Sequence, residues 1–127
     1  MPTNTSRCSR TGKPYNRRHM NELESSLALM LGRKRMKKIQ GVRIGIAGAG
    51  GLGSNCALNL VRCGFNNLLI VDFDVVEHSN LNRQFYFSDQ VGMKKVEALR
   101  KNLLGINPDA RIDTSCLIID EKNAIRL

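Results

Sequence analysis

The glycines of residues 48–53, Gly-Ala-Gly-Gly-Leu-Gly, limit the folds open to this chain more than any other segment. They follow a short apolar run and precede a segment of small residues. Glycines at the first, third and sixth positions permit a tight turn, close approach of the backbone to phosphate oxygens, and close packing of a helix on a strand. A helix that begins here points free N–H groups at an anion. This glycine loop predicts a nucleotide-binding strand–loop–helix unit; the alternative is a glycine-rich turn without a ligand.

Apolar and amphipathic segments alternate after residue 41. We predict strand, helix, strand, helix and strand, in that order, over residues 42–47, 53–62, 68–72, 94–104 and 111–119. This order is the N-terminal half of a Rossmann-like, doubly wound α/β sheet whose strands are mostly parallel. Because half of such a sheet leaves an edge strand unpaired, we expect self-association or a further C-terminal portion. Asp120 is a candidate cap for a last helix.

The chain before this unit is strongly basic. Residues 1–40 contain ten Lys and Arg against two acids, whereas residues 41–127 contain ten against nine. We interpret residues 1–20 as a flexible basic leader and residues 21–41 as a lead-in helix that Asn21 caps. Leu23, Leu27, Met30 and Leu31 would form the apolar face of that helix, against the sheet or another subunit. Residues 42–127 would then be one nucleotide-binding domain.

Several functional classes are excluded by composition. No apolar run approaches the ~20 residues that a membrane span needs. The four cysteines include no CxxC pair, so this chain has no zinc motif and no disulfide framework. We therefore expect no membrane partner and a reducing, cytoplasmic location.

Polar residues follow the second predicted strand. Asp72 ends that strand nineteen residues after the third glycine, near the ~20 expected of a carboxylate that binds ribose. Arg83 offers a planar cationic fork for phosphate oxygens, and Lys95 offers a point charge at the start of the next helix. Asn80 and Gln84 can donate hydrogen bonds beside them. This combination predicts a site for a nucleoside triphosphate.

Fixed cations suit attack on the α-phosphate of ATP, because charge grows there and on the departing pyrophosphate. A carboxylate nucleophile would need no general base. The alternatives assign these residues no role in binding: Arg83 and Lys95 would be ordinary surface charges, and Asp74 would cap a turn. An NAD-linked oxidoreductase is a further alternative, but it leaves Asn80, Arg83 and Lys95 unexplained.

At these residues the chain resembles the ThiF/MoeB/HesA family of adenylyltransferases, which activate sulfur-carrier and ubiquitin-like proteins. The resemblance rests on residues 48–53, 72–74, 79–84, 91–97 and 106–108 and spans residues 42 to about 120. Phe85-Tyr86-Phe87 is most similar to ThiF-type proteins of thiamine biosynthesis. The resemblance implies that ATP with Mg²⁺ reacts with the C-terminal glycine carboxylate of a small carrier of thiamine or molybdopterin type. The products would be an acyl-adenylate and pyrophosphate.

The resemblance also implies residue roles. Asp72 would hold ribose, Asn80, Arg83 and Lys95 would hold the phosphates, and Gln84 would help to fix the site. The implied cofactor-binding set is Gly48, Gly50, Gly51, Gly53, Asp72, Asp74, Asn80, Arg83, Gln84 and Lys95, with Arg83 and Lys95 also catalytic. The protein would be a homodimer, and Arg17 is a candidate for reaching the ATP site of a partner subunit.

The resemblance places the family's magnesium-binding aspartate, reactive cysteine and zinc-binding CxxC pairs beyond Leu127. We therefore expect this chain to hold the nucleotide-binding part alone, in apparently truncated form. Two other functions stay open: a non-catalytic module that binds nucleotide or carrier, and a relative that modifies a tRNA base. In the second case the basic leader would hold nucleic acid electrostatically.

Overall fold

The structure is a computed structural model that describes residues 20–127. Its helices and strands are α1 (Glu22–Leu31), α2 (Arg33–Gln40), β1 (Ile44–Ala47), α3 (Gly51–Arg62), β2 (Asn67–Val71), α4 (Lys95–Ile106) and β3 (Arg111–Ser115). The predicted basic leader, apart from its last residue, and Arg17 lie outside the described residues. None of the helices within residues 20–127 is long and apolar enough to cross a membrane.

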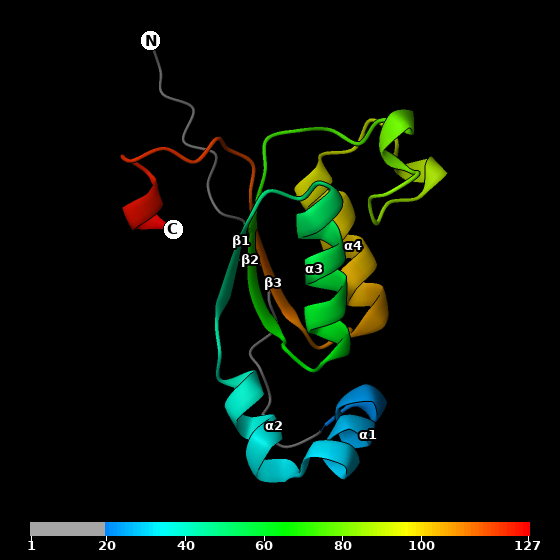
Figure 1. The fold of residues 1–127 in the computed structure, drawn as a ribbon, viewed down its shortest axis with the longest axis vertical. Helices are drawn as coiled ribbons and strands as arrows, with labels where there is room; N and C mark the ends of the chain where they lie inside the picture. The colour runs from blue at the N-terminus through cyan, green and yellow to red at the C-terminus, as the bar shows by residue number, and fades with distance from the viewer. Residues whose placement is uncertain (1–19) are drawn as a thin grey trace.

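Three parallel strands form one sheet in the order β1-β2-β3. Helices α3 and α4 connect successive strands and cover the same face of the sheet (Figure 1). Right-handed crossovers between parallel strands produce this arrangement, because each helix packs back on the sheet it leaves. The Rossmann-like α/β fold predicted from the sequence is confirmed. Its glycine loop lies at the carboxyl ends of the strands, the edge where such sheets bind ligands.

The core lies between the sheet and these two helices. Its fully buried apolar side chains include Leu68, Ile70, Ala57, Val61, Leu99 and Leu103. The prediction of a buried first strand over residues 42–47 is wrong in part, because β1 begins at Ile44 and only its Ile46 is buried. On the sheet face opposite α3 and α4, Gly45 and Ala47 are exposed and help to line a shallow hollow of about 380 Å³.

The other boundaries agree with the sequence to within a few residues. The third strand ends at Ser115, well before residue 119. The last predicted helix is a single 3-10 turn, Ala124–Arg126. Asp120 does not cap it, since no side chain does. One Asp120 carboxylate oxygen instead accepts hydrogen bonds from the N–H groups of Lys122 and Asn123 in the preceding turn, both at 2.9 Å.

The single lead-in helix is in fact two helices. The chain breaks at Gly32, whose φ of 84° is readily adopted only by glycine. Asn21 caps α1 as predicted, accepting a hydrogen bond from the N–H of Glu24 at 2.9 Å. The predicted apolar face is wrong in part: Leu23, Leu27 and Leu31 are half-buried, but Met30 is 82% exposed and the buried residue of α1 is Glu24.

Polar contacts explain how α1 is held to the domain. Glu24 accepts a hydrogen bond from the side chain of Asn66, which precedes β2, at 3.3 Å. Asn21 donates from its side chain to Asn107 at 2.6 Å and to Asp109 at 2.9 Å. The helix therefore docks on the loops that precede β2 and β3 through amides and carboxylates, and its leucines are left half-buried or exposed.

Apolar packing holds α2 instead. Met36 is fully buried and lies against Gly64, where an added Cβ would come within 3.1 Å of the Met36 methyl group. Replacing Met36 with alanine should lower the free energy of unfolding by about 2–4 kcal/mol, measured by urea denaturation. Leu29→Ala is the control, since Leu29 is 90% exposed and its loss should cost less than about 0.5 kcal/mol. Equal stabilities for the two variants would contradict this packing.

Candidate functional site

The glycine loop closes tightly on the end of β1. Gly48 has a φ of 98°, and its N–H donates to the carbonyl of Val71 at 2.8 Å. A Cβ on Gly53 would overlap the carbonyl oxygen of Gly48 and lie 2.8 Å from its carbonyl carbon. Helix α3 then begins at Gly51, and no side chain caps it at Gly50. The first turn of α3 can therefore receive an anion, as the loop predicts.

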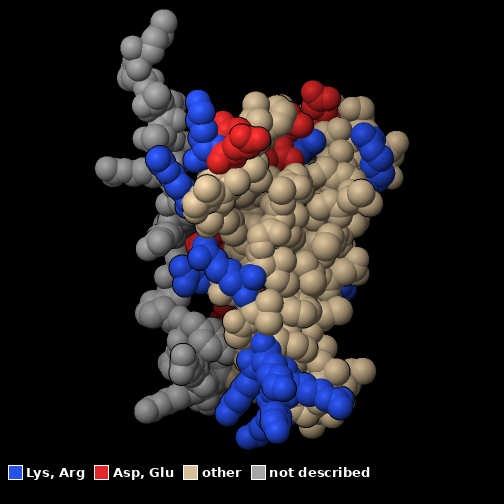
Figure 2. All heavy atoms as spheres, turned by 60° about the vertical axis from the view of Figure 1, so that its left-hand side comes forward, with Lys and Arg blue, Asp and Glu red and all other residues tan. Residues whose placement is uncertain are grey.

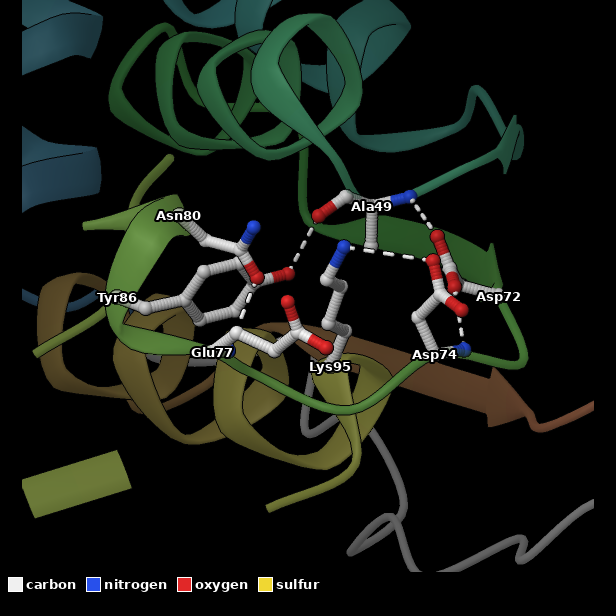
Figure 3. A network of polar contacts seen from close by, with 7 residues as sticks. All are labelled: Ala49, Asp72, Asp74, Glu77, Asn80, Tyr86 and Lys95. Atoms are coloured by element: carbon white, nitrogen blue, oxygen red, sulfur yellow. Dashed lines mark hydrogen bonds and ion pairs between the residues drawn. The ribbon is translucent and has the colours of Figure 1, made fainter. Parts of the chain in front are cut away.

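Asp72 ties this loop to the end of β2 (Figure 3). One carboxylate oxygen accepts from the N–H of Ala49 at 2.6 Å, and the other accepts from the N–H of Asp74 at 2.7 Å. Each oxygen keeps a second lone pair that could accept from a ribose hydroxyl. The structure thus places Asp72 beside the glycine loop, where the spacing of the sequence predicts it.

Tyr86 approaches the same loop from the other side. Its hydroxyl donates to the carbonyl of Ala49 at 2.6 Å, and the side chain is buried. Burial, and to a lesser degree the negative charge of Asp72, raise the pKa of the Tyr86 phenol above its usual range. The hydroxyl therefore keeps its proton and stays a donor. No role for Tyr86 was predicted from the sequence, where the available signal was a hydroxyl-bearing aromatic residue two positions after Gln84.

Lys95 is the first residue of α4 and points toward the underside of the glycine loop (Figure 3). Its side chain is buried, and its Nζ lies 3.5 Å from a carboxylate oxygen of the half-exposed Asp74. The backbone of the two residues is also joined, since the Lys95 N–H donates to the Asp74 carbonyl at 2.9 Å. The predicted cation is therefore in the crevice, but Asp74 already pairs with it.

Asn80 shapes the turn that follows β2. It is buried, and its side-chain oxygen accepts from the N–H of Glu77 at 2.9 Å. The N–H of Asn80 donates in return to the backbone carbonyl of Glu77 at 3.0 Å, and the Asn80 carbonyl accepts from the N–H of Gln84 at 2.9 Å. The side-chain oxygen of Asn80 therefore holds the turn, which leaves its amide nitrogen as the group that could donate to a phosphate.

Arg83 lies at the exposed end of this turn. Its Nη1 donates to the carbonyl of Ser79 and to the side chain of Asn82, both at 2.9 Å. The side chain of Asn55 donates to the carbonyls of both Gly51 and Arg83, at 2.6 and 2.8 Å. Arg83 is thereby fixed next to the loop. Asn55 also had no assigned role, because only the fold shows that it faces Arg83.

Gln84 completes the contact between turn and loop. It is buried, its Nε2 lies 3.9 Å from where a Gly50 Cβ would be, and its Oε1 has no hydrogen-bond partner. Buried polar atoms without partners are uncommon, and each calls for an explanation. A donor group on a ligand in the glycine loop would satisfy this oxygen. One edge of the sheet thus brings together the glycine loop, the free N-terminus of α3, the carboxylate of Asp72, and the cations Arg83 and Lys95.

A protein-family comparison agrees with this geometry. The model of the ThiF family matches residues 23–127. The chain belongs to the ThiF family. The prediction made from the residues of the loop and turn is therefore confirmed.

Curated relatives of this ThiF-family chain include ubiquitin-like modifier-activating enzyme 5 from several organisms. The protein of Drosophila persimilis is 46% identical over 81 residues, which are 64% of this chain and 21% of that protein. The protein of Oryza sativa subsp. japonica is 46% identical over 83 residues, or 65% and 20% of the two chains. The chain thus spans about a fifth of the length of these relatives.

Solved structures with the same fold include nucleotide complexes. Escherichia coli TcdA, a tRNA N6-threonylcarbamoyladenosine dehydratase in complex with ATP, superposes with a TM-score of 0.75 at 29% identity, covering 80% of this chain and 42% of TcdA. E. coli MccB with ATP superposes with a TM-score of 0.66 at 28% identity, covering 72% and 27%.

Proposed function

We propose that this chain is the ATP-binding part of an adenylyltransferase that activates the C-terminal carboxylate of a ubiquitin-like carrier protein. The observation that carries the proposal is the meeting of Arg83, Lys95 and the uncapped first turn of α3 around one glycine loop. An oxidoreductase that binds NAD would not require so many groups that favour the binding of a triphosphate.

The chain's own residues suit the charges of this reaction. The carrier carboxylate would attack the α-phosphorus of ATP, a phosphorus–oxygen bond would form to the carboxylate, and pyrophosphate would leave. Negative charge grows on the phosphoryl oxygens during this step, and cations held in place before the reaction stabilise it most. Arg83 is held by a hydrogen bond from its Nη1, and Lys95 is held by its ion pair with Asp74. Neither cation therefore has to be ordered from a mobile position when ATP binds.

Asp72 and Gln84 would orient the nucleoside. Asp72 is fixed by two backbone N–H groups and can accept from ribose hydroxyls, and the free Oε1 of Gln84 can accept from a further ligand donor. Within residues 20–127 no three His, Cys, Asp or Glu side chains gather to hold a metal ion. Mg²⁺ is commonly bound by phosphates, waters and one or two carboxylates, so Asp74 is the candidate to approach a phosphate-bound Mg²⁺.

The finer assignments belong to the same proposal. A carrier of thiamine or molybdopterin type and the homodimer stay predictions from the resemblance, and the cytoplasmic location stays a prediction from the cysteines. The similarity to ubiquitin-like modifier-activating enzyme 5 supports a ubiquitin-like modifier as the carrier class.

Exchange of labelled pyrophosphate into ATP tests the proposal. We expect exchange that requires both ATP and a small ubiquitin-like carrier ending in glycine, and none when the carrier lacks its last residue. ATP binding without exchange for any carrier would favour the non-catalytic module. Absence of ATP binding by the folded chain would contradict the proposal.

A second candidate function, activation of a tRNA base, is favoured by the surface of α2. This helix exposes Arg33, Lys34, Arg35, Lys37 and Lys38. Figure 2 shows a cluster of Lys and Arg at the lower end of the molecule, where Figure 1 places α2. Nucleic acid would neutralise these cations, and TcdA is named for a modified tRNA. Salt-dependent tRNA binding that is lost in Lys34→Glu/Lys37→Glu, together with tRNA-dependent ATP turnover, would favour this function over the carrier.

A further inference from the structure

The hydroxyl of Tyr86 donates a hydrogen bond to the carbonyl of Ala49, which belongs to the peptide between Ala49 and Gly50. The carboxylate of Asp72 accepts a hydrogen bond from the N–H of Ala49. Both hydrogen bonds are 2.6 Å long. We propose that Tyr86 is a positioning residue that fixes the direction of the Gly50 N–H, so that this N–H faces the nucleotide phosphates. The inference rests on the proposed function and assigns Tyr86 a role in it.

Peptide geometry connects the two groups. The peptide between Ala49 and Gly50 is planar and trans, so its C=O and its N–H point in opposite directions. Tyr86 binds the C=O of Ala49 from the buried side of the loop (Figure 3). The N–H of Gly50 must therefore point away from the buried ring. Gly50 is the N-cap of α3, and its N–H lies at the same helix end as the free N–H groups of the first turn.

The hydroxyl can control this peptide because Tyr86 is itself held in place. The N–H of the preceding Phe85 donates to the hydroxyl of Ser54 at 3.1 Å, and the carbonyl of Phe85 accepts from the side chain of Asn102 at 2.8 Å. Asn102 also exchanges two hydrogen bonds with Gln90, at 2.7 and 3.0 Å. Tyr86 is thus anchored to both α3 and α4.

The loop, in contrast, has little to hold it by itself. Residues 48, 50, 51 and 53 are glycines, which have the widest choice of backbone angles. Asp72 fixes the N–H of Ala49 but not the next peptide. Without the Tyr86 hydroxyl, the Ala49–Gly50 peptide would be free to rotate about its neighbouring bonds, and its N–H would be lost to the phosphates for part of the time.

The test is Tyr86→Phe, which removes the hydroxyl and keeps the buried ring. We expect calorimetry to show an affinity for ATP about tenfold lower than that of the parent chain. A tenfold loss corresponds to the free energy of one hydrogen bond to a charged group. The affinity for adenosine, which has no phosphates, should be unchanged. A general loosening of the fold would lower both affinities together, so equal losses, or no loss for ATP, would overturn the inference.

Thr114→Val is the matched control, because it removes one buried hydroxyl hydrogen bond, from Thr114 to Glu97, and touches neither Ala49 nor the groups that hold Tyr86. It should leave the ratio of ATP to adenosine affinity as in the parent chain. A second readout needs no nucleotide: the ¹⁵N–¹H signal of Gly50 should shift or broaden in Tyr86→Phe and not in Thr114→Val. An unmoved Gly50 signal would overturn the inference even if ATP binding is found, and ATP binding itself tests the proposed function separately.

Discussion

Arg83→Ala should reduce carrier-dependent pyrophosphate exchange by about 100- to 1,000-fold, the usual cost of removing one group that stabilises transition-state charge. Arg83 carries a permanently charged fork, and its Cγ lies 4.0 Å from where a Cβ on Gly51 would be. Its hydrogen bonds go to the exposed Ser79 carbonyl and Asn82 side chain, which water can replace. The free energy of unfolding should therefore change by less than about 1 kcal/mol.

The control for this variant is Arg62→Ala, which removes an exposed arginine from the last turn of α3, away from the loop. It should keep parental exchange. Arg83→Lys should recover only part of the activity, because a lysine ammonium cannot bind two phosphate oxygens as a fork does. Parental exchange in Arg83→Ala would remove Arg83 from the proposed machinery.

Gly53→Ala should have the largest effect on stability, a loss of at least about 3 kcal/mol in the free energy of unfolding. The new Cβ would overlap the carbonyl of Gly48, which is backbone and cannot turn aside as a flexible side chain could. Gly48 is itself held by the hydrogen bond from its N–H to Val71. Relief of the overlap would push α3 away from β1, and ATP binding should be lost with the loop. Thermal unfolding followed by circular dichroism measures the change.

Gly105→Ala is the matched control for that substitution. Gly105 lies in α4, has ordinary backbone angles, and an added Cβ would meet nothing within 4 Å. Alanine is favoured over glycine inside a helix, so this variant should be as stable as the parent or up to about 1 kcal/mol more stable. Equal stability of the two variants would show that the loop does not pack as described.

Local signals in the sequence were enough to predict the sheet and the glycine loop. Gly48 and Gly53 need glycine for reasons that lie within a few residues, and Asp72 follows from its spacing to the loop. That the strands are parallel follows from the alternation of helix and strand, because parallel strands need crossover connections. Family membership could be predicted because several such local motifs occur in one order.

Features that depend on distant partners could not be predicted. Tyr86 and Ala49 are 37 residues apart, and Glu24 and Asn66 are 42 apart, so neither hydrogen bond leaves a local pattern. The apolar spacing of residues 23–31 also did not show that the buried residue of α1 is Glu24, which hydrogen-bonds Asn66. The pairing of Lys95 with Asp74 was also missed, since nothing in the sequence states how deeply the start of α4 is buried.

The central claim is that cations and backbone N–H groups around the glycine loop bind the phosphates of ATP. Calorimetric titration of the folded chain with ATP and Mg²⁺, and separately with NADH, tests it most directly. The structure predicts saturable binding of ATP, weakened in Arg83→Ala, and little or no binding of NADH. Preference for NADH, with ATP ignored, would contradict the claim.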